Sequence, residues 1–222
     1  MKLRFEDCSS RYPQPDPFEL LDDRMLAKLG LENPLRRIEL RPVTTKNENA
    51  SIAFFGLNAY CGQDYEEASV QPNFVEWCQD RYNGKLQAVI ELYMSNLPLS
   101  GSAYFSNYFK VVLPQGKYKK AADLKPLMSD TSIIGAMDSL LRTEVECRIN
   151  SGCRIFVVMG NDAYRNFMRC IRLNQEQLIC SEPRIVRGEF NGQSIIIAKN
   201  IHFSRYRKAD TNSVIRELKR LI

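Results

Sequence analysis

The sequence predicts an α/β domain with a three-layer α/β/α arrangement around a central, mostly parallel, four-stranded sheet. Short apolar runs, typical of strands buried on both faces, alternate with longer segments in which apolar residues recur at three and four positions. Three runs end in glycine or polar residues, at residues 51–56, 155–160 and 194–204, and a fourth strand is expected at 104–114. Strands that alternate with helices in this way favour a sheet covered on both sides.

The length and composition of the chain predict a single domain over residues 1–222. With 222 residues, of which 44% are hydrophobic, the chain can bury one substantial core. Residues 1–37 are expected to form an N-terminal arm that is extended and then helical, because its leading segment contains three prolines, at 13–17, and few periodic apolar positions. The extended segment is predicted to lead into a short helix at 18–29, with Gly30 as its cap.

The remaining elements follow from the spacing of apolar residues. An alternating pattern at 38–43, with Pro42 near its end, predicts a half-exposed edge strand. An Asn191-Gly192 pair predicts a turn between two strands within 184–199. Helical spacing predicts helices at 74–82, 86–97, 131–150, 162–171 and 212–222.

Charge and cysteine content narrow the class of protein. A net charge of +5 is compatible with a polyanionic partner such as DNA. Acidic clusters lie in the first third of the chain, so a protein partner for this part is a further possibility. The 7 cysteines form no CxxC pair and follow no secretory segment, so we expect a reduced, cytoplasmic protein without a metal site or cofactor. No apolar stretch has the length of a membrane span, so no membrane association is predicted.

Polar side chains follow or end several of the predicted strands. Asn58 comes directly after the first run, Asn107 and Lys110 lie within the strand-like segment 104–114, and His202, the 1 histidine of the chain, follows the last run. In parallel sheets, ligands bind at the carboxyl ends of the strands. The sequence therefore predicts one cleft to which these residues contribute.

Four short motifs in this order resemble those of the uracil-DNA glycosylase superfamily, over residues 51–222. FFGLNAY at 54–60 is similar to the first motif of the superfamily, and YFSNYFKVVLP at 104–114 to the TNxxKxxPP segment of its iron–sulfur branch. VVMGNDAY at 157–164 resembles a later strand–glycine–helix unit, and HFSRYRK at 202–208 resembles the closing HPSPLS motif. Ala59 and Phe203 stand where those motifs have proline, and the cysteine spacing of an iron–sulfur cluster is absent.

The resemblance implies a fold like that of uracil-DNA glycosylase and a role for each matching residue. Asn58 would orient the attacking water, and His202 would stabilise the departing base as a neutral hydrogen-bond donor. Asn107 would read uracil, because a carboxamide presents an acceptor and a donor side by side. Tyr60 would exclude thymine by crowding C5, and Phe74 would stack on the flipped base. Asp64 is a second candidate for the base that activates water.

The resemblance also implies DNA contacts after His202. Ser204 would bind a flanking phosphate, and the following basic and aromatic residues would fill the vacated stack or meet the backbone. The predicted DNA-binding residues are Lys110, Ser204, Arg205, Tyr206, Arg207 and Lys208.

Three functions remain open from the sequence. The first is a DNA glycosylase that flips out uracil or a related damaged base and hydrolyses its N-glycosidic bond. The second is a nucleic-acid or nucleotide-binding module of the same fold with little catalysis, which Ala59, Phe203 and the lack of a carboxylate at position 58 favour. The third is a protein-interaction domain. Each predicted site residue also has a structural alternative, as a core aromatic, a solvated charge or an asparagine that pins a loop.

Overall fold

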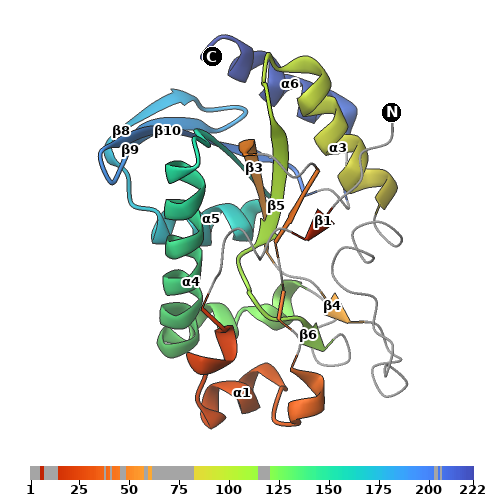
Figure 1. Ribbon diagram of the computed structural model, residues 1–222, viewed down its shortest axis with the longest axis vertical. Coiled ribbons are helices and arrows are strands. Elements are labelled where there is room, and N and C mark those ends of the chain that lie inside the picture. The colour runs from red at the N-terminus through yellow and green to blue at the C-terminus, as the bar shows by residue number, and fades with distance from the viewer. Residues whose placement is uncertain are drawn as a thin grey trace.

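The structure, a computed structural model, is a layered α/β fold built on one large sheet (Figure 1). It describes residues 6–7, 15–37, 39–40, 42–45, 49–57, 60–61, 83–114, 121–202, 205 and 207–222. Within these ranges the large sheet has 8 strands in the order β1-β2-β5-β3-β7-β10-β9-β8. The α/β class predicted from the sequence is therefore confirmed.

The centre of the sheet consists of parallel strands. These are β5 (Ser102–Asn107), β3 (Ala50–Gly56), β7 (Ile155–Met159) and β10 (Gln193–Asn200). β3 pairs in parallel with β5 on one side and with β7 on the other, and β7 pairs in parallel with β10. β7 consists almost entirely of aromatic and β-branched residues, and all but one of the residues of β3 are buried, which suits strands that are covered on both faces.

Antiparallel strands extend both edges of this centre, so the prediction of a four-stranded, mostly parallel sheet was wrong. On one side β2 (Val43–Thr44) pairs with β5, and β1 (Glu6–Asp7) pairs with β2. On the other side β9 (Ile185–Phe190) pairs with β10, and β8 (Asn174–Cys180) pairs with β9. A second sheet joins β4 (Tyr60–Cys61) to β6 (Leu113–Pro114). The sheet is thus mixed and larger than predicted.

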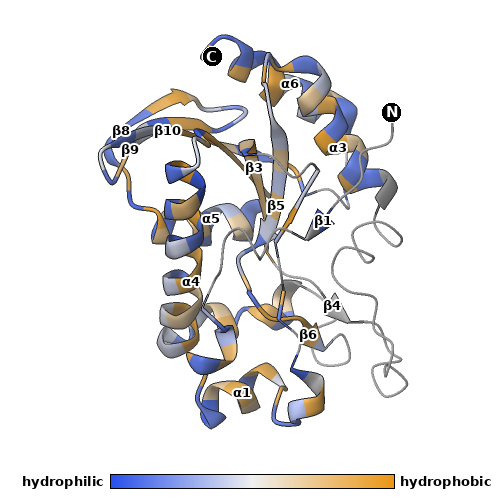
Figure 2. Cartoon of the chain, viewed as in Figure 1, coloured by the Kyte–Doolittle hydropathy of each residue, from blue (hydrophilic) through white to orange (hydrophobic). Residues whose placement is uncertain are grey.

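Helices cover both faces of the sheet. One apolar core cluster joins the sheet to α1 (Asp23–Leu29), α4 (Thr131–Asn150) and α5 (Asn161–Cys170). The other joins it to α3 (Asn83–Asn96) and α6 (Lys208–Lys219). Figure 2 shows β3 mostly in hydrophobic colours, whereas α4 alternates between hydrophobic and hydrophilic along its length, as an amphipathic helix does. Short 3-10 turns lie at η1 (Pro17–Glu19), η2 (Pro34–Arg36), η3 (Ala121–Leu124) and η4 (Leu127–Ser129).

Local sequence signals explain several element boundaries. The Asp130 side chain accepts hydrogen bonds from two backbone amides at the start of α4, which begins and ends where predicted. Gly30 ends α1 in the left-handed conformation, with φ 75°. The turn between β9 and β10 has positive φ at both Asn191 and Gly192, as this pair predicts.

Other predicted boundaries were wrong. The helix expected at 18–29 is divided, because the side chain of Asp22 caps a separate helix, α1. The strand expected at 38–43 begins only at Val43, and it is not an edge strand because β1 pairs with it. The last helix begins at Lys208 rather than at residue 212. The helix predicted at 74–82 lies outside the described residues. None of the described helices is long and apolar enough to cross a membrane.

Candidate functional site

The last residues of the four central strands lie side by side at the same edge of the sheet. We call these four residues the row: Asn107, Gly56, Met159 and Asn200. Asn107 on β5 pairs in register with Gly56 on β3, and Asn200 on β10 pairs with Met159 on β7. The register of β3 with β7 places Gly56 and Met159 at the same level. Strand residues alternate between faces, and the residues two positions earlier all belong to the core under α3 and α6: Phe105, Phe54, Val157 and Ala198. The row therefore faces the α3 and α6 side of the sheet.

The side-chain amide of Asn107 occupies the space beside Gly56, which has no side chain. Its side chain is buried, with 1% of the residue exposed. A Cβ atom placed on Gly56 would lie only 2.2 Å from Asn107 Oδ1, so the missing side chain of Gly56 is the space that this amide occupies. Asn107 Nδ2 has no hydrogen-bond partner within the described part of the chain. A buried amide without a partner costs about 1–3 kcal/mol, and such a group calls for an explanation such as a ligand.

The backbone around Asn107 is held firmly. The amide of Tyr108 donates to Gly56 O at 2.9 Å, and the amide of Phe109 donates to Leu57 O at 2.9 Å. The ammonium of Lys110 donates to Asn107 O at 2.5 Å. The loop after β5 is thereby tied to the end of β3 through backbone groups, and none of these contacts involves the Asn107 side chain.

Lys110 lies in the interior rather than at a surface that DNA could reach. Only 1% of the residue is exposed, and its ammonium pairs with Glu144 of α4 and donates to Ser106 Oγ at 2.9 Å. Burial lowers the pKa of Lys110, and the charge of Glu144 opposes that shift. The phosphate contact predicted for Lys110 does not fit this placement, because reaching a phosphate would require breaking a buried ion pair.

His202 lies beyond the end of β10, against Gly160. A Cβ atom on Gly160 would meet the Cβ of His202 at 3.4 Å and its ring carbon Cδ2 at 3.6 Å. Gly160 has φ 97° and donates its amide to Asn200 O at 2.8 Å, which ties the end of β7 to that of β10. Burial, and then the positive charge of Arg205, lower the pKa of His202 below its usual value. The imidazole is therefore neutral at pH 7 and can donate one hydrogen bond.

Asn200 is a row residue that the sequence analysis did not select. It is 2% exposed, and its Oδ1 accepts from the amide of Ile201 at 2.9 Å. Its Nδ2, like that of Asn107, lacks a hydrogen-bond partner among the residues described. The signal was present, because Asn200 ends an apolar run in the same way as Asn107 does.

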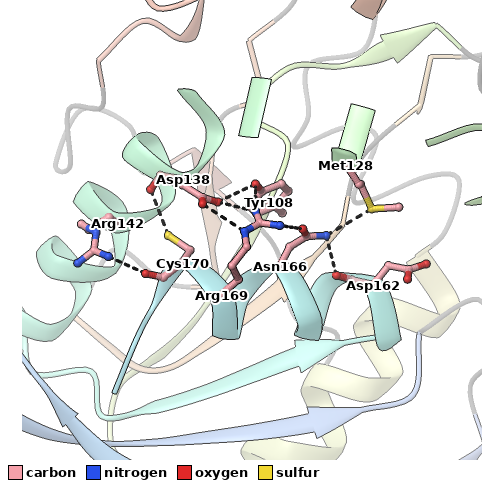
Figure 3. Close-up of polar contacts among 8 residues, drawn as sticks. All are labelled: Tyr108, Met128, Asp138, Arg142, Asp162, Asn166, Arg169 and Cys170. Carbon is pink, nitrogen blue, oxygen red and sulfur yellow. Dashed lines mark hydrogen bonds and ion pairs between the residues drawn. The ribbon is translucent and has the colours of Figure 1, made fainter. Parts of the chain in front are cut away.

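A second polar cluster, which the sequence also did not reveal, lies beneath the loop after β5 (Figure 3). The guanidinium of Arg169 donates to Asp138 Oδ1 at 2.9 Å, to the Tyr108 hydroxyl at 2.7 Å and to Asn166 Oδ1 at 2.6 Å. The Tyr108 hydroxyl donates in turn to Asp138 Oδ1 at 2.7 Å. Burial and the adjacent Asp138 carboxylate raise the pKa of Tyr108, so the phenol stays protonated. This cluster joins the loop to α4 and α5.

Cys170 and Arg142 extend this cluster along α4 and α5. The thiol of Cys170 contacts Asp138 O at 3.2 Å, and Arg142 donates to Cys170 O at 2.7 Å. Burial, followed by the charge of Asp138, raises the pKa of Cys170 to about 12. Such a thiol is not a nucleophile at neutral pH, and its contacts join α4 to α5.

The remaining predicted site residues are placed only in part. Arg205 and Arg207, which lie between His202 and α6, and Lys208, the first residue of α6, are exposed. For Tyr60 the structure describes the strand β4 but not the side chain. Asn58, Asp64, Phe74, Ser204 and Tyr206 lie outside the described residues. The described residues include no group of three or more histidine, cysteine or acidic side chains that could hold a metal ion.

Comparisons with known proteins do not assign a family. No family model matches the chain, and no curated protein matches it significantly. Among solved structures, the crystal structure of Haemophilus influenzae protein HI1011, DUF1537, is similar over 86% of this chain, with 9% identity and a TM-score of 0.34. The match covers 44% of that protein, so this chain spans less than half of its length.

Proposed function

We propose that the protein is a DNA glycosylase that removes uracil or a related damaged base from DNA. The observation that carries this proposal is Asn107 at the carboxyl end of a central parallel strand, a buried side chain whose Nδ2 has no hydrogen-bond partner among the described residues. An enzyme that excises a base must flip it from the stack and read its Watson–Crick edge in a closed pocket. A buried amide whose Nδ2 has no partner among the described residues suits this task, because the flipped base would supply a hydrogen bond to it.

The chemistry of uracil matches this amide. Asn107 offers a donor and an acceptor side by side, which pair with uracil O4 and N3–H, whereas cytosine presents a donor and an acceptor in the opposite order. Nδ2 is the free donor, and it would bind O4. Oδ1 points over Gly56, the residue that opens the space for it.

His202 is the proposed donor to the departing base. Cleavage of the N-glycosidic bond puts negative charge on the base, and a neutral imidazole can stabilise that charge near O2. His202 lies against the end of β7, two strands from β5. Two inter-strand spacings amount to about 10 Å, a span that one planar base with a hydrogen bond on each side can bridge. Asn58, by resemblance, would orient the water that attacks the sugar.

The fold and the surface charges support the same proposal. The parallel order β5-β3-β7-β10, with helices on both faces, is the arrangement expected of a uracil-DNA glycosylase-like domain, to which the antiparallel strands are additions. Arg205, Arg207 and Lys208 are exposed beside His202 and would meet the DNA backbone, with Ser204 and Tyr206. The second candidate is a binding module of the same fold, which Ala59 in place of proline favours.

The test is excision from a labelled oligonucleotide that contains one uracil, both single-stranded and paired, followed by alkaline cleavage of abasic sites. We expect cleavage by the wild type and a loss of about 10²-fold or more in Asn58→Ala and in His202→Ala. Asn107→Asp should weaken the preference for uracil over cytosine. Asn150→Ala, which removes an exposed asparagine at the end of α4, is the matched control and should retain activity.

Two outcomes contradict the proposal. Absence of cleavage together with salt-dependent DNA binding would instead support the binding module. Absence of both would favour a protein-interaction domain. Loss of folding in Asn58→Ala or His202→Ala, measured by circular dichroism, would assign those residues a structural role.

A further inference from the structure

The buried ion pair of Lys110 and Glu144 has no role in the reaction proposed above. It lies on the α4 side of the sheet, whereas the row that contains Asn107 faces α3 and α6. We propose that this pair is a positioning device that fixes the Asn107 amide for recognition of a base. The recognition part of this inference rests on the proposed function, but the fixing of Asn107 does not.

The peptide unit that follows Asn107 is held at both of its polar ends. Its carbonyl, Asn107 O, accepts from the Lys110 ammonium at 2.5 Å, and its amide, the N–H of Tyr108, donates to Gly56 O at 2.9 Å. Because a peptide unit is planar, fixing both ends fixes the backbone dihedral ψ of Asn107 and hence the direction of its Cβ. Lys110 therefore acts on the side chain of Asn107 without touching it.

The ammonium of Lys110 is itself locked. It donates to Ser106 Oγ at 2.9 Å and pairs with Glu144, and Glu144 also accepts from the hydroxyl of Tyr104. The guanidinium of Arg148 lies over the ring of Tyr104, 4.5 Å from its centre. Lys110 and Glu144 are both 1% exposed at the side chain, so water does not compete for these contacts.

The free-energy cost of burying charges indicates that this pair positions Asn107 rather than stabilises the fold. Removing two charges from water is costly, and well-packed apolar residues often replace a buried ion pair without loss of stability. What apolar residues cannot supply is a donor aimed at Asn107 O. A recognition group must be held within about 0.5 Å of its productive position by the residues that support it.

The experiment compares the wild type with a double variant, Lys110→Met/Glu144→Gln, which removes both charges of the pair. Lys110→Met alone is the second variant, in case the double variant does not fold, because it removes the donor to Asn107 O while Glu144 keeps its hydrogen bond from the Tyr104 hydroxyl. Native-state hydrogen exchange, followed by NMR without DNA, reports on the amides of Tyr108 and Phe109. We expect these amides to exchange about 10-fold faster or more in the double variant, while the amides of β7 remain protected. Unchanged protection of Tyr108 would overturn the inference.

Excision kinetics supply the second readout. If the wild type excises uracil, the double variant should lose about 10-fold or more of its selectivity for uracil over cytosine, through kcat, with KM for DNA within about twofold. Lys28→Met, which removes the ion pair with Asp130 between α1 and the start of α4, is the matched control and should change neither readout. Unchanged selectivity in the double variant would overturn the recognition part of the inference.

The failure of the proposed function is distinguishable from the failure of this inference. Absence of excision by the wild type counts against the glycosylase alone. Hydrogen exchange at Tyr108 then supports or overturns the positioning role by itself.

Discussion

The close approach of Asn107 to Gly56 makes Gly56→Ala a strong test of the site geometry. The added Cβ would lie 2.2 Å from Asn107 Oδ1, at least about 0.8 Å closer than the 3.0 Å below which real Cβ contacts essentially never fall. Both residues are buried, so the amide or the strand ends must shift to relieve this contact. Overpacking of this kind costs about 1–3 kcal/mol. For a domain of this size, that cost lowers Tm by about 2–12 °C.

The same geometry predicts that a second substitution rescues the first. In Gly56→Ala/Asn107→Ala the clashing amide is gone, and the nearest remaining atom, Cζ of Phe105, lies at an ordinary 3.7 Å from the new Cβ. We expect the double variant to recover most of the lost stability, with a coupling energy of about 1–3 kcal/mol in the double-mutant cycle.

The assay is urea unfolding followed by circular dichroism, with the free energy of unfolding obtained by linear extrapolation. Gly135→Ala is the matched control, because a Cβ on this exposed glycine of α4 has nothing within 4 Å. It should raise stability by about 0.5–1 kcal/mol, as glycine to alanine does within a helix. A Gly56→Ala variant as stable as the wild type, or one that Asn107→Ala does not rescue, would refute the proposed placement of the amide.

Three further predictions concern pKa values and ion pairs. The single histidine, His202, should titrate in NMR below its usual pKa of about 6.5. The unfolded chain then takes up a proton at a higher pH than the folded protein, so the unfolding free energy should fall as the pH drops through 6.5 toward the folded-state pKa. His202→Phe should remove that dependence, and an NMR titration midpoint of His202 above 6.5 would contradict the prediction. Arg169→Met should destabilise the protein by about 1–3 kcal/mol, whereas Arg165→Met, which breaks an exposed 3.5 Å pair, should change stability by less than about 0.5 kcal/mol; equal effects in chemical unfolding would count against the cluster in Figure 3. Cys153, whose pKa burial raises to about 12, should resist iodoacetamide at pH 8 in the native state, while the half-buried Cys180 is modified, as peptide mass spectrometry would show.

Much of the fold follows from local patterns in the sequence. The helix at 131–150 was predictable because its apolar spacing is regular and Asp130 caps it. The outer strand β8 was not, because five of its seven residues are exposed and its segment, NQEQLIC, has little apolar alternation. A strand of this kind depends on pairing with β9, which lies later in the chain. The turn between β9 and β10 was predictable from Asn191-Gly192, but the other antiparallel pairs join segments whose pairing has no local signal in the sequence.

The sequence predicted that polar residues lie at the ends of central strands, but not how the side chains around them are paired. Asn107 and His202 stood out because each ends or follows an apolar run, and the structure places both at the carboxyl ends of the central strands. Lys110 was misplaced because a lysine near a predicted cleft is ordinarily exposed, and its partner Glu144 is 34 residues away in sequence. Pairing between distant residues of this kind carries no local signal.

The sheet also separates residues that would contact a ligand from those that support them. The row from Asn107 to Asn200 faces α3 and α6, while the ion pair under Asn107 and the Tyr108 cluster belong to the side of α4 and α5. Sequence change on the two faces can therefore proceed independently. If the proposed function holds, substitutions around Met159 and Asn200 would alter which ligand binds and leave the support of Asn107 intact, so specificity could diverge without a change of fold.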